Sequence, residues 1–231
     1  MHGFNEYGYG LWPVVIFNIA VFSLFAYFAF RPRTKRDWRT LGAFSGFMVA
    51  LFSEMFGYPL TIYILTSILG KRYPVLDPFS HANGHLWVVL AGDSPVLFNI
   101  VHIISNIFIF GGLFIIAIGW RGIHLGNGQL VMDGIYRFVR HPQYSGFILA
   151  IIGFLLQWPT LITLIMAPML FVMYTRLARK EEKTMINTFG EQYSDYIKKV
   201  PGFIPKKIIT FRDAVEILRV FKKPIQKEKS K

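Results

Sequence analysis

The residues best able to do chemistry gather between Gly134 and Gly146, where the chain reads Gly-Ile-Tyr-Arg-Phe-Val-Arg-His-Pro-Gln-Tyr-Ser-Gly. Pro142 interrupts any helix there, because its ring clashes with the preceding turn and it has no N–H. It also favours an extended backbone at His141. Irregular polar backbone at the edge of a membrane survives only where protein or a water-filled cavity covers it. This stretch is therefore predicted to be a binding site, and its polar side chains are Tyr136, Arg137, Arg140, His141 and Tyr144.

A second polar group follows about forty residues later, with Glu181 and Glu182 and then Tyr193 and Tyr196. An arginine such as Arg140 can hold a carboxylate through two parallel hydrogen bonds. A glutamate can accept hydrogen bonds from an ammonium group or from ribose hydroxyls, and a histidine can do either. The two groups together would suit an amphoteric ligand that carries a carboxylate, an amine and a ribose.

The same residues also have a structural explanation that involves no ligand. Arginines at a cytoplasmic membrane boundary commonly fix topology, and tyrosines there commonly form an interfacial belt. Each residue alone fits that explanation about as well as it fits a site. The joint pattern, with Gly134 and Gly146 allowing close backbone approach, favours a site.

Composition identifies the environment in which this site must be built. The chain has 231 residues, of which 53% are hydrophobic and 17% aromatic, and its net charge is +12. Several apolar runs approach the roughly 20 residues needed to cross a bilayer. Basic excess beside such runs is typical of the cytoplasmic side and of anionic lipid, so nucleic-acid binding is not indicated. The absence of cysteine excludes disulfides, thiolate metal sites and thiol nucleophiles.

The apolar runs predict an all-α polytopic membrane protein with about five membrane-embedded helices. Three spans are expected at residues 11–30, 41–69 and 96–120, followed by a helical hairpin over 147–177 that turns near Trp158-Pro159. The first span is followed, and not preceded, by basic residues, so we expect the N-terminus outside and the C-terminus in the cytosol. These residues are Arg31, Arg33, Lys35, Arg36 and Arg39.

Three parts of the chain are expected to differ in role. Residues 1–119 would form the N-terminal transmembrane helices, with a basic cytosolic loop at 31–39 and an outer loop at 70–96. Residues 120–205 would form the core that carries the site. Residues 206–231 would form a basic amphipathic tail, because Phe211, Val215, Leu218 and Phe221 share one helical stripe after a start signal at Thr210 and Asp213. The Lys-rich end of the tail is expected to be disordered.

Polar residues inside the predicted spans form a second group of candidates. Glu54 lies in the second span, where a carboxylate is costly and needs a partner, and Gly57 with Pro59 predicts a kink. His102 and Asn106 lie on one face of the third span together with Asn99. That face could make ordinary interhelical hydrogen bonds, or it could be the wall of a substrate cavity with Glu54 as its partner.

The outer loop holds two histidines four residues apart, His81 and His85. Such a pair can bind a metal on a helix, but the intervening Asn83-Gly84 indicates a turn. Interfacial loop histidines are the expectation, and no metal site is predicted.

The motifs of the second half of the chain resemble those of a known family. Several motifs in a fixed order resemble those of isoprenylcysteine carboxyl methyltransferases and the related phospholipid methyltransferases. They are the string from Arg140 to Gly146, an apolar hairpin, Glu181-Glu182, and Phe-Gly-Glu-Gln-Tyr-Ser-Asp-Tyr at 189–196 with Val200-Pro201. The resemblance covers about residues 120–205. It implies a membrane-embedded methyltransferase that uses S-adenosyl-L-methionine and a lipophilic acceptor reached from the bilayer. No nucleic acid and no obligatory protein partner are implied.

The resemblance also implies roles for individual residues. Glu181, Glu182 and Arg140 would be catalytic. Glu54, His102 and Asn106 lie outside the resemblance, and their polarity inside the spans is what makes them candidates for the substrate cavity. The cofactor would be bound by a larger set: Leu130, Val131, Gly134, Tyr136, Arg140, His141, Pro142, Tyr144, Gly146, Glu182, Tyr193 and Tyr196. The acceptor is either the carboxylate of a prenylated cysteine-like substrate or a lipid amine.

Two other functions remain open from the sequence. A membrane reductase using NADPH would have a comparable helical layout, although the paired glutamates favour methyl transfer. A non-enzymatic carrier would use Glu54, His102 and Asn106 as its polar path, and its function would not depend on the Gly134–Gly146 stretch.

Overall fold

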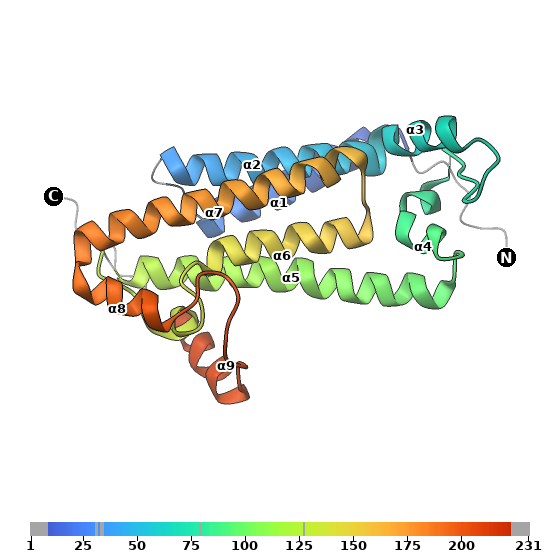
Figure 1. Cartoon of the computed structure of the whole chain (residues 1–231). Helices are drawn as coiled ribbons and strands as arrows, with labels where there is room; N and C mark the ends of the chain where they lie inside the picture. The colour runs from blue at the N-terminus through green and yellow to red at the C-terminus, as the bar shows by residue number, and fades with distance from the viewer. Residues whose placement is uncertain (1–8, 31, 33–34, 79, 127, 223–231) are drawn as a thin grey trace. The chain divides into compact units, whose positions relative to one another are not determined.

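The computed structural model describes residues 9–30, 32, 35–78, 80–126 and 128–222, which are mainly helical and contain no strand (Figure 1). It divides the chain into two compact units. One consists of Met1–Phe110 with Leu149–Phe171, and the other of Gly111–Ile148 with Val172–Lys231. Each is described by itself. Arg31, Arg33 and the Lys-rich end, on which part of the topology prediction depends, lie outside the described residues.

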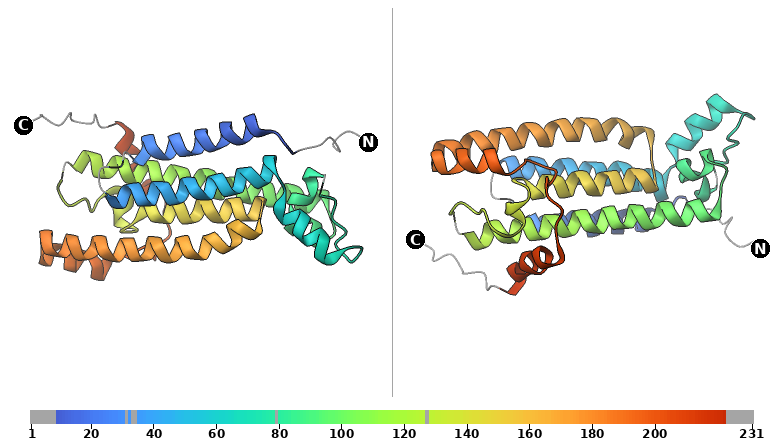
Figure 2. Two further views of the ribbon diagram at one scale, coloured as in Figure 1. Left: turned by 90° about the horizontal axis from the view of Figure 1, so that it is seen from above. Right: turned by 60° about the horizontal axis from the view of Figure 1, so that its bottom comes forward.

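The first unit begins with α1 (Trp12–Phe30), which packs beside α2 (Lys35–Phe52), as Figures 1 and 2 show. Aromatic rings fill part of its interior. The ring of Phe22 lies 5.5 Å from that of Phe52 and 5.2 Å from that of Phe154, centroid to centroid. Such offset and edge contacts add to the stability gained by burying the rings. The first predicted span is thus confirmed as a helix.

The second predicted span is a broken helix. α2 ends at Phe52, a π turn (η1, Ser53–Gly57) follows, and α3 (Leu60–Leu69) begins after Pro59. Pro59 cannot donate the amide hydrogen bond that would continue the helix. The carboxylate of Glu54 instead accepts a 2.7 Å hydrogen bond from the Thr61 amide in the first turn of α3. The predicted kink is therefore confirmed, and it takes the form of a complete interruption of the helix between Phe52 and Leu60.

The hairpin prediction is confirmed. α6 (Pro142–Gln157) and α7 (Leu161–Phe189) are joined by the short turn at 158–160. The hydroxyl of Thr160 accepts a hydrogen bond from the Thr163 amide at 3.1 Å, which satisfies a donor at the start of α7. Pro142 is the first residue of α6, a position where its missing N–H costs nothing.

A short segment between α3 and α5 also belongs to the first unit. It contains a 3₁₀ turn (η2, His81–Gly84) and α4 (Leu86–Leu90). Gly84 lies against the ring of Trp158 so closely that a Cβ at this position would be 1.8 Å from it. The loop is thereby fixed to the hairpin turn.

The second unit is built on the latter half of α5 (Pro95–Gly126), which is longer than the predicted span at 96–120. Its 32 residues reach about 48 Å at 1.5 Å per residue, well beyond the roughly 30 Å hydrocarbon layer. A 3₁₀ turn (η3, Gly134–Arg137) follows. α7 ends at Phe189, and Gly190 at φ +57° precedes α8 (Glu191–Lys199).

The tail forms α9 (Phe211–Leu218) and one 3₁₀ turn (η4, Arg219–Lys222). Thr210 and Asp213 form a reciprocal capping box at its start, so the predicted start signal is confirmed. The apolar stripe predicted for this helix is solvent-exposed: Phe211, Val215, Leu218 and Phe221 are 85%, 41%, 44% and 43% exposed.

Four described segments are long and apolar enough to cross a membrane: α1, residues 37–57, α5 and α7. α6 is apolar but has only 16 residues. The chain is therefore an all-α, polytopic integral membrane protein, as the sequence predicts.

Candidate functional site

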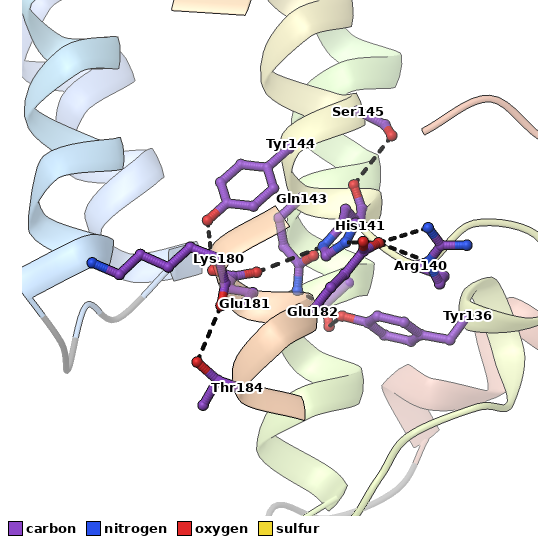
Figure 3. Close-up of polar contacts among 11 residues, drawn as sticks. Tyr136, Arg140, His141, Gln143, Tyr144, Ser145, Lys180, Glu181, Glu182 and Thr184 are labelled. Atoms are coloured by element: carbon purple, nitrogen blue, oxygen red, sulfur yellow. Dashed lines mark hydrogen bonds and ion pairs between the residues drawn. The ribbon is translucent and has the colours of Figure 1, made fainter. Parts of the chain in front are cut away.

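Two cations and two carboxylates from the predicted site meet in the second unit (Figure 3). Oε1 of Glu182 accepts hydrogen bonds from Nε and Nη2 of Arg140 at 2.9 and 2.6 Å. Nε2 of His141 lies 3.0 Å from the same oxygen, and its Nδ1 lies 3.6 Å from Oε2 of Glu181. These groups are about forty residues apart in the sequence. They are in direct contact because the start of α6 at Pro142 lies against α7.

Arg140 is also bound to the end of α8. Its Nη1 donates to the carbonyl of Ile197 at 3.0 Å and to the carbonyl of Val200. A cation at a helix C-terminus is favourable, because the last carbonyls lack intrahelical partners. With Nε, Nη1 and Nη2 all engaged, Arg140 fixes Glu182 and α8, which fits a positioning role better than direct contact with a ligand.

Residues 201–203 form a strap over the start of α6. The amide of Arg140 donates to the carbonyl of Pro201 at 2.9 Å, and that of His141 donates to the carbonyl of Gly202 at 3.0 Å. The hydroxyl of Ser145 donates to the carbonyl of Phe203 at 2.8 Å. The broken backbone predicted around Pro142 therefore has its hydrogen bonds satisfied by the strap.

Tyr144 connects this cluster to an aromatic stack. Its hydroxyl donates to Oε1 of Glu181 at 2.6 Å, and its ring lies 5.7 Å from that of Tyr174. Tyr174 also stacks on Phe147 and is fully buried. Its hydroxyl has no hydrogen-bond partner among the described residues. Buried hydroxyls are normally paired, so an unpaired one beside this cluster is consistent with a ligand or water site.

Tyr136 joins three elements of the unit. Its hydroxyl donates to the Gly119 carbonyl of α5 at 3.0 Å and accepts from the amide of Gln143 at 2.6 Å. Its carbonyl accepts from the hydroxyl of Tyr196 on α8 at 2.6 Å. Tyr193 lies on the same helix as Tyr196, and burial raises the pKa of the Tyr193 hydroxyl to about 12. Gln143 was missed as a site residue, although it lies inside the quoted motif.

A cavity of about 250 Å³ lies beside Tyr136. Of the residues expected near a nucleoside, Val131, Gly134 and Tyr136 line it, and Leu130 does not. The other lining residues come from α5, η3 and the tail: Ile118, Gly122, Asp133, Ile135, Glu216, Ile217, Arg219 and Val220. Its lining residues from the tail were not expected from the sequence.

Gly146 serves helix packing. A Cβ built on it would lie 2.5 Å from the Gly112 carbonyl and 2.7 Å from the Ile116 side chain, both on α5. The backbones of α5 and α6 therefore approach closely here, as small residues allow in membrane helices.

The protonation of His141 is coupled to the two glutamates. Burial alone would lower the pKa of this imidazole, but the bonds to Glu181 and Glu182 outweigh burial and raise its pKa above the usual value. A raised native pKa stabilises the fold fully below the unfolded-state value of about 6.5, and this contribution is lost as pH rises through the native pKa.

We therefore expect the thermal stability of the ligand-free protein in detergent to fall as pH rises from about 6 to about 9. His141→Gln should remove that part of the pH dependence, because glutamine does not titrate. The measurement is the midpoint of thermal unfolding of both proteins across this range. Parallel curves for the two proteins would show that His141 does not carry this coupling.

The predicted substrate-cavity residues are not gathered in one place. Asn106 lines a cavity of about 190 Å³ in the first unit, among the rings of Phe22, Phe52, Phe56, Phe110, Phe154 and Trp158. His102 stacks on His85 with ring centroids 4.7 Å apart. One carboxylate oxygen of Glu54 accepts a hydrogen bond from the Thr61 amide, and a place for Glu54 in a substrate cavity stays a prediction. The other oxygen of Glu54 has no hydrogen-bond partner among the described residues.

The outer-loop histidines are packed against the hairpin turn. The rings of His81 and His85 lie 4.4 and 4.8 Å from that of Trp158, and Nδ1 of His85 lies 2.9 Å from the Gln157 carbonyl. Within the described ranges, no three His, Cys, Asp or Glu side chains are placed to hold a metal ion.

Comparison with known proteins points in the same direction as the geometry. Residues 87–187 match the isoprenylcysteine carboxyl methyltransferase (ICMT) family. A protein-S-isoprenylcysteine O-methyltransferase of Schizosaccharomyces pombe is 38% identical over 77 residues, 33% of each chain. One from Arabidopsis thaliana is 32% identical over 78 residues, 33% of this chain and 40% of the relative.

A longer match is more distant. Methanethiol S-methyltransferase 2 of Bradyrhizobium diazoefficiens is 26% identical over 208 residues, 85% of this chain and 75% of the relative. The matched part spans about a third of the S. pombe relative and 40% of the Arabidopsis one. Residues 87–187 are therefore similar to the ICMT family, and the longer match to a methyltransferase is in keeping with this similarity.

Proposed function

We propose that this chain is an integral membrane methyltransferase that uses S-adenosyl-L-methionine and acts on a lipophilic acceptor. The observation that carries the proposal is the cluster of Arg140, His141, Glu181 and Glu182 beside the cavity at Tyr136. The names of the relatives, all methyltransferases, support it.

The residues present fit the cofactor at both of its ends. Its amino-acid end is a zwitterion, which needs an acceptor for the ammonium and donors for the carboxylate. Glu181 is the more open carboxylate, with 31% of its side chain exposed against 19% for Glu182, so we assign the ammonium to Glu181. The nearest donors for the carboxylate are a protonated His141 and the hydroxyl of Tyr144, and each would have to exchange its contact with Glu181 for one with the ligand. The mixed polar and apolar cavity beside Tyr136 is assigned to the nucleoside.

The bound cofactor would supply an electrophilic methyl group. The protein then has to position the acceptor in line and exclude water, and positioning alone can account for much of the rate. Arg140 would hold Glu182 and α8 in place for this, through its bonds to both. A carboxylate acceptor needs no base, whereas an ammonium acceptor must first lose a proton. Glu181 or Glu182 would accept that proton.

In the first unit, the aromatic cavity that includes Asn106 could bury an apolar group of a lipophilic ligand. A lipophilic chain gains free energy by burial against such rings, and an amide such as Asn106 can orient a polar group at its end. Both acceptors expected from the sequence, a prenylated cysteine-like carboxylate and a lipid amine, fit this description. We also propose that the C-terminus lies in the cytosol and the N-terminus outside, because basic residues follow the first span and do not precede it.

The test is calorimetric titration of the purified full-length protein in detergent with S-adenosylmethionine. We expect micromolar-range affinity for the wild type, weakened at least about tenfold by His141→Ala, because a charged hydrogen bond is lost. His124→Ala is the matched control, since His124 bonds its own helix at Trp120 and lies outside the cluster. Absence of binding by a folded wild type, with or without added lipid, would refute the proposal. Binding of NADPH instead would indicate a reductase.

A further inference from the structure

The tail forms one wall of the cavity assigned to the nucleoside. Four of the lining residues lie on α9 and η4: Glu216, Ile217, Arg219 and Val220. All four lie beyond residue 187, where the match to the ICMT family ends. The cavity therefore depends on a part of the chain that the family comparison does not cover.

The tail is held against the unit by specific contacts. Ile217 is 7% exposed and packs in a cluster with Ile118 and Ile135. Arg121 donates from Nε to the Val220 carbonyl at 2.8 Å and from Nη2 to the Phe221 carbonyl at 3.1 Å. Its guanidinium also lies 5.4 Å from the centre of the Phe221 ring. These contacts and the capping box give the wall a defined position.

Glu216 is the acidic residue of this wall. One of its oxygens accepts a 2.8 Å hydrogen bond from Arg137, and the two side chains are 48% and 50% exposed. Ion pairs this exposed contribute little to stability. The carboxylate can therefore take a new hydrogen-bond partner at small cost while Arg137 stays nearby.

The rest of the cavity fits a purine nucleoside. Ile118, Ile135 and Val220 offer apolar surface for a flat ring. Gly134 has φ +58°, and no atom lies within 4 Å of the position a Cβ would take, which leaves open space above the backbone. Carboxylates recur in nucleotide sites as acceptors for ribose hydroxyls, because one carboxylate can accept from both hydroxyls of the diol.

We propose that Glu216 is a cofactor-binding residue that accepts hydrogen bonds from the ribose hydroxyls of the bound nucleoside. This inference rests on the proposed function, since it names a further residue of the same site. The tail would thus take a direct part in recognising the cofactor. The ribose would be bound by Glu216 and not by Asp133, the other carboxylate that lines the cavity.

The test compares S-adenosylmethionine with its 2′-deoxy analogue by calorimetry, using the full-length protein in detergent. The wild type should prefer the ribose form by about tenfold, as expected for a hydrogen bond to a charged group. Glu216→Gln should weaken binding of the ribose form more than that of the deoxy form, which keeps only the 3′-hydroxyl, so that the preference falls to about threefold or less. A purely structural role of Glu216 would weaken both ligands equally.

Three controls separate the possible results. Arg137→Gln breaks the ion pair but keeps the carboxylate, so the ribose preference should persist. Glu191→Gln, which removes an exposed glutamate of α8, should change neither affinity. An unchanged ribose preference in Glu216→Gln overturns the inference, and its loss in Asp133→Asn alone transfers the role to Asp133. Failure of the wild type to bind S-adenosylmethionine at all would refute the proposed function itself.

Discussion

Replacing Glu182 by glutamine is expected to destabilise the protein strongly and to abolish measurable S-adenosylmethionine binding. Oε1 of Glu182 accepts hydrogen bonds from Nε and Nη2 of Arg140 and lies 3.0 Å from Nε2 of His141. The neutral amide of glutamine cannot balance the positive charge of the Arg140 guanidinium. Arg140 would stay buried, with 12% of its side chain exposed and no carboxylate beside it. Removing one partner of a buried pair typically costs about 3–5 kcal/mol. The measurements are the thermal unfolding midpoint and the calorimetric titration of the variant in detergent.

The control is an ion pair of the same type on the surface. Asp195 and Lys198 on α8 lie 2.9 Å apart, with 61% and 75% of their side chains exposed. Asp195→Asn should leave both the unfolding midpoint and the cofactor affinity unchanged, because exposed pairs are screened by solvent. If Glu182→Gln behaved like Asp195→Asn, the cluster would have neither the structural nor the binding role assigned to it.

Gly146→Ala is expected to destabilise the second unit by roughly 1–3 kcal/mol, the usual cost of forcing an extra group into a packed interface. The new methyl group would lie 2.5 Å from the Gly112 carbonyl and 3.1 Å from the Ile116 amide nitrogen. Both are backbone atoms of α5, so no side-chain rotation can relieve the overlap and the helices must move apart. Thermal unfolding in detergent measures the effect.

Gly42→Ala in α2 is the matched control, because no atom lies within 4 Å of the position of its new Cβ. This change should leave stability unchanged or raise it slightly, since alanine favours the helix by up to about 1 kcal/mol. Equal behaviour of the two variants would show that α5 and α6 do not approach closely at Gly146.

Local features of the fold were predictable because their causes lie in neighbouring residues. Trp158-Pro159 predicts the hairpin turn, since proline ends one helix and Thr160 starts the next. Gly190 predicts the break before α8 for the same kind of reason. The start of α9 follows from Thr210 and Asp213, which are three residues apart.

Features that depend on distant residues could not be predicted in this way. The sequence marks Glu54 as needing a partner, but the partner is a backbone amide released by the interruption at Pro59. Likewise, the sequence motifs predict that Arg140 and Glu182 share one site. No pattern in the neighbouring sequence predicts that Nη1 of Arg140 donates to the carbonyls of Ile197 and Val200. The tail wall of the cavity depends on Arg121 reaching Val220, 99 residues later, which no local pattern contains.

The strap at 201–203 also has a consequence for a chain that ends early. The carbonyls that pair with the amides of Arg140 and His141 belong to Pro201 and Gly202, which leave the ribosome after every segment long enough to span the membrane. The carbonyl that accepts the hydrogen bond of the Ser145 hydroxyl belongs to Phe203, 58 residues later in the chain. A chain truncated before Pro201 would therefore keep all the described candidate spans, while the start of α6 would lack these partners. The candidate site thus needs residues that are not required for spanning the membrane.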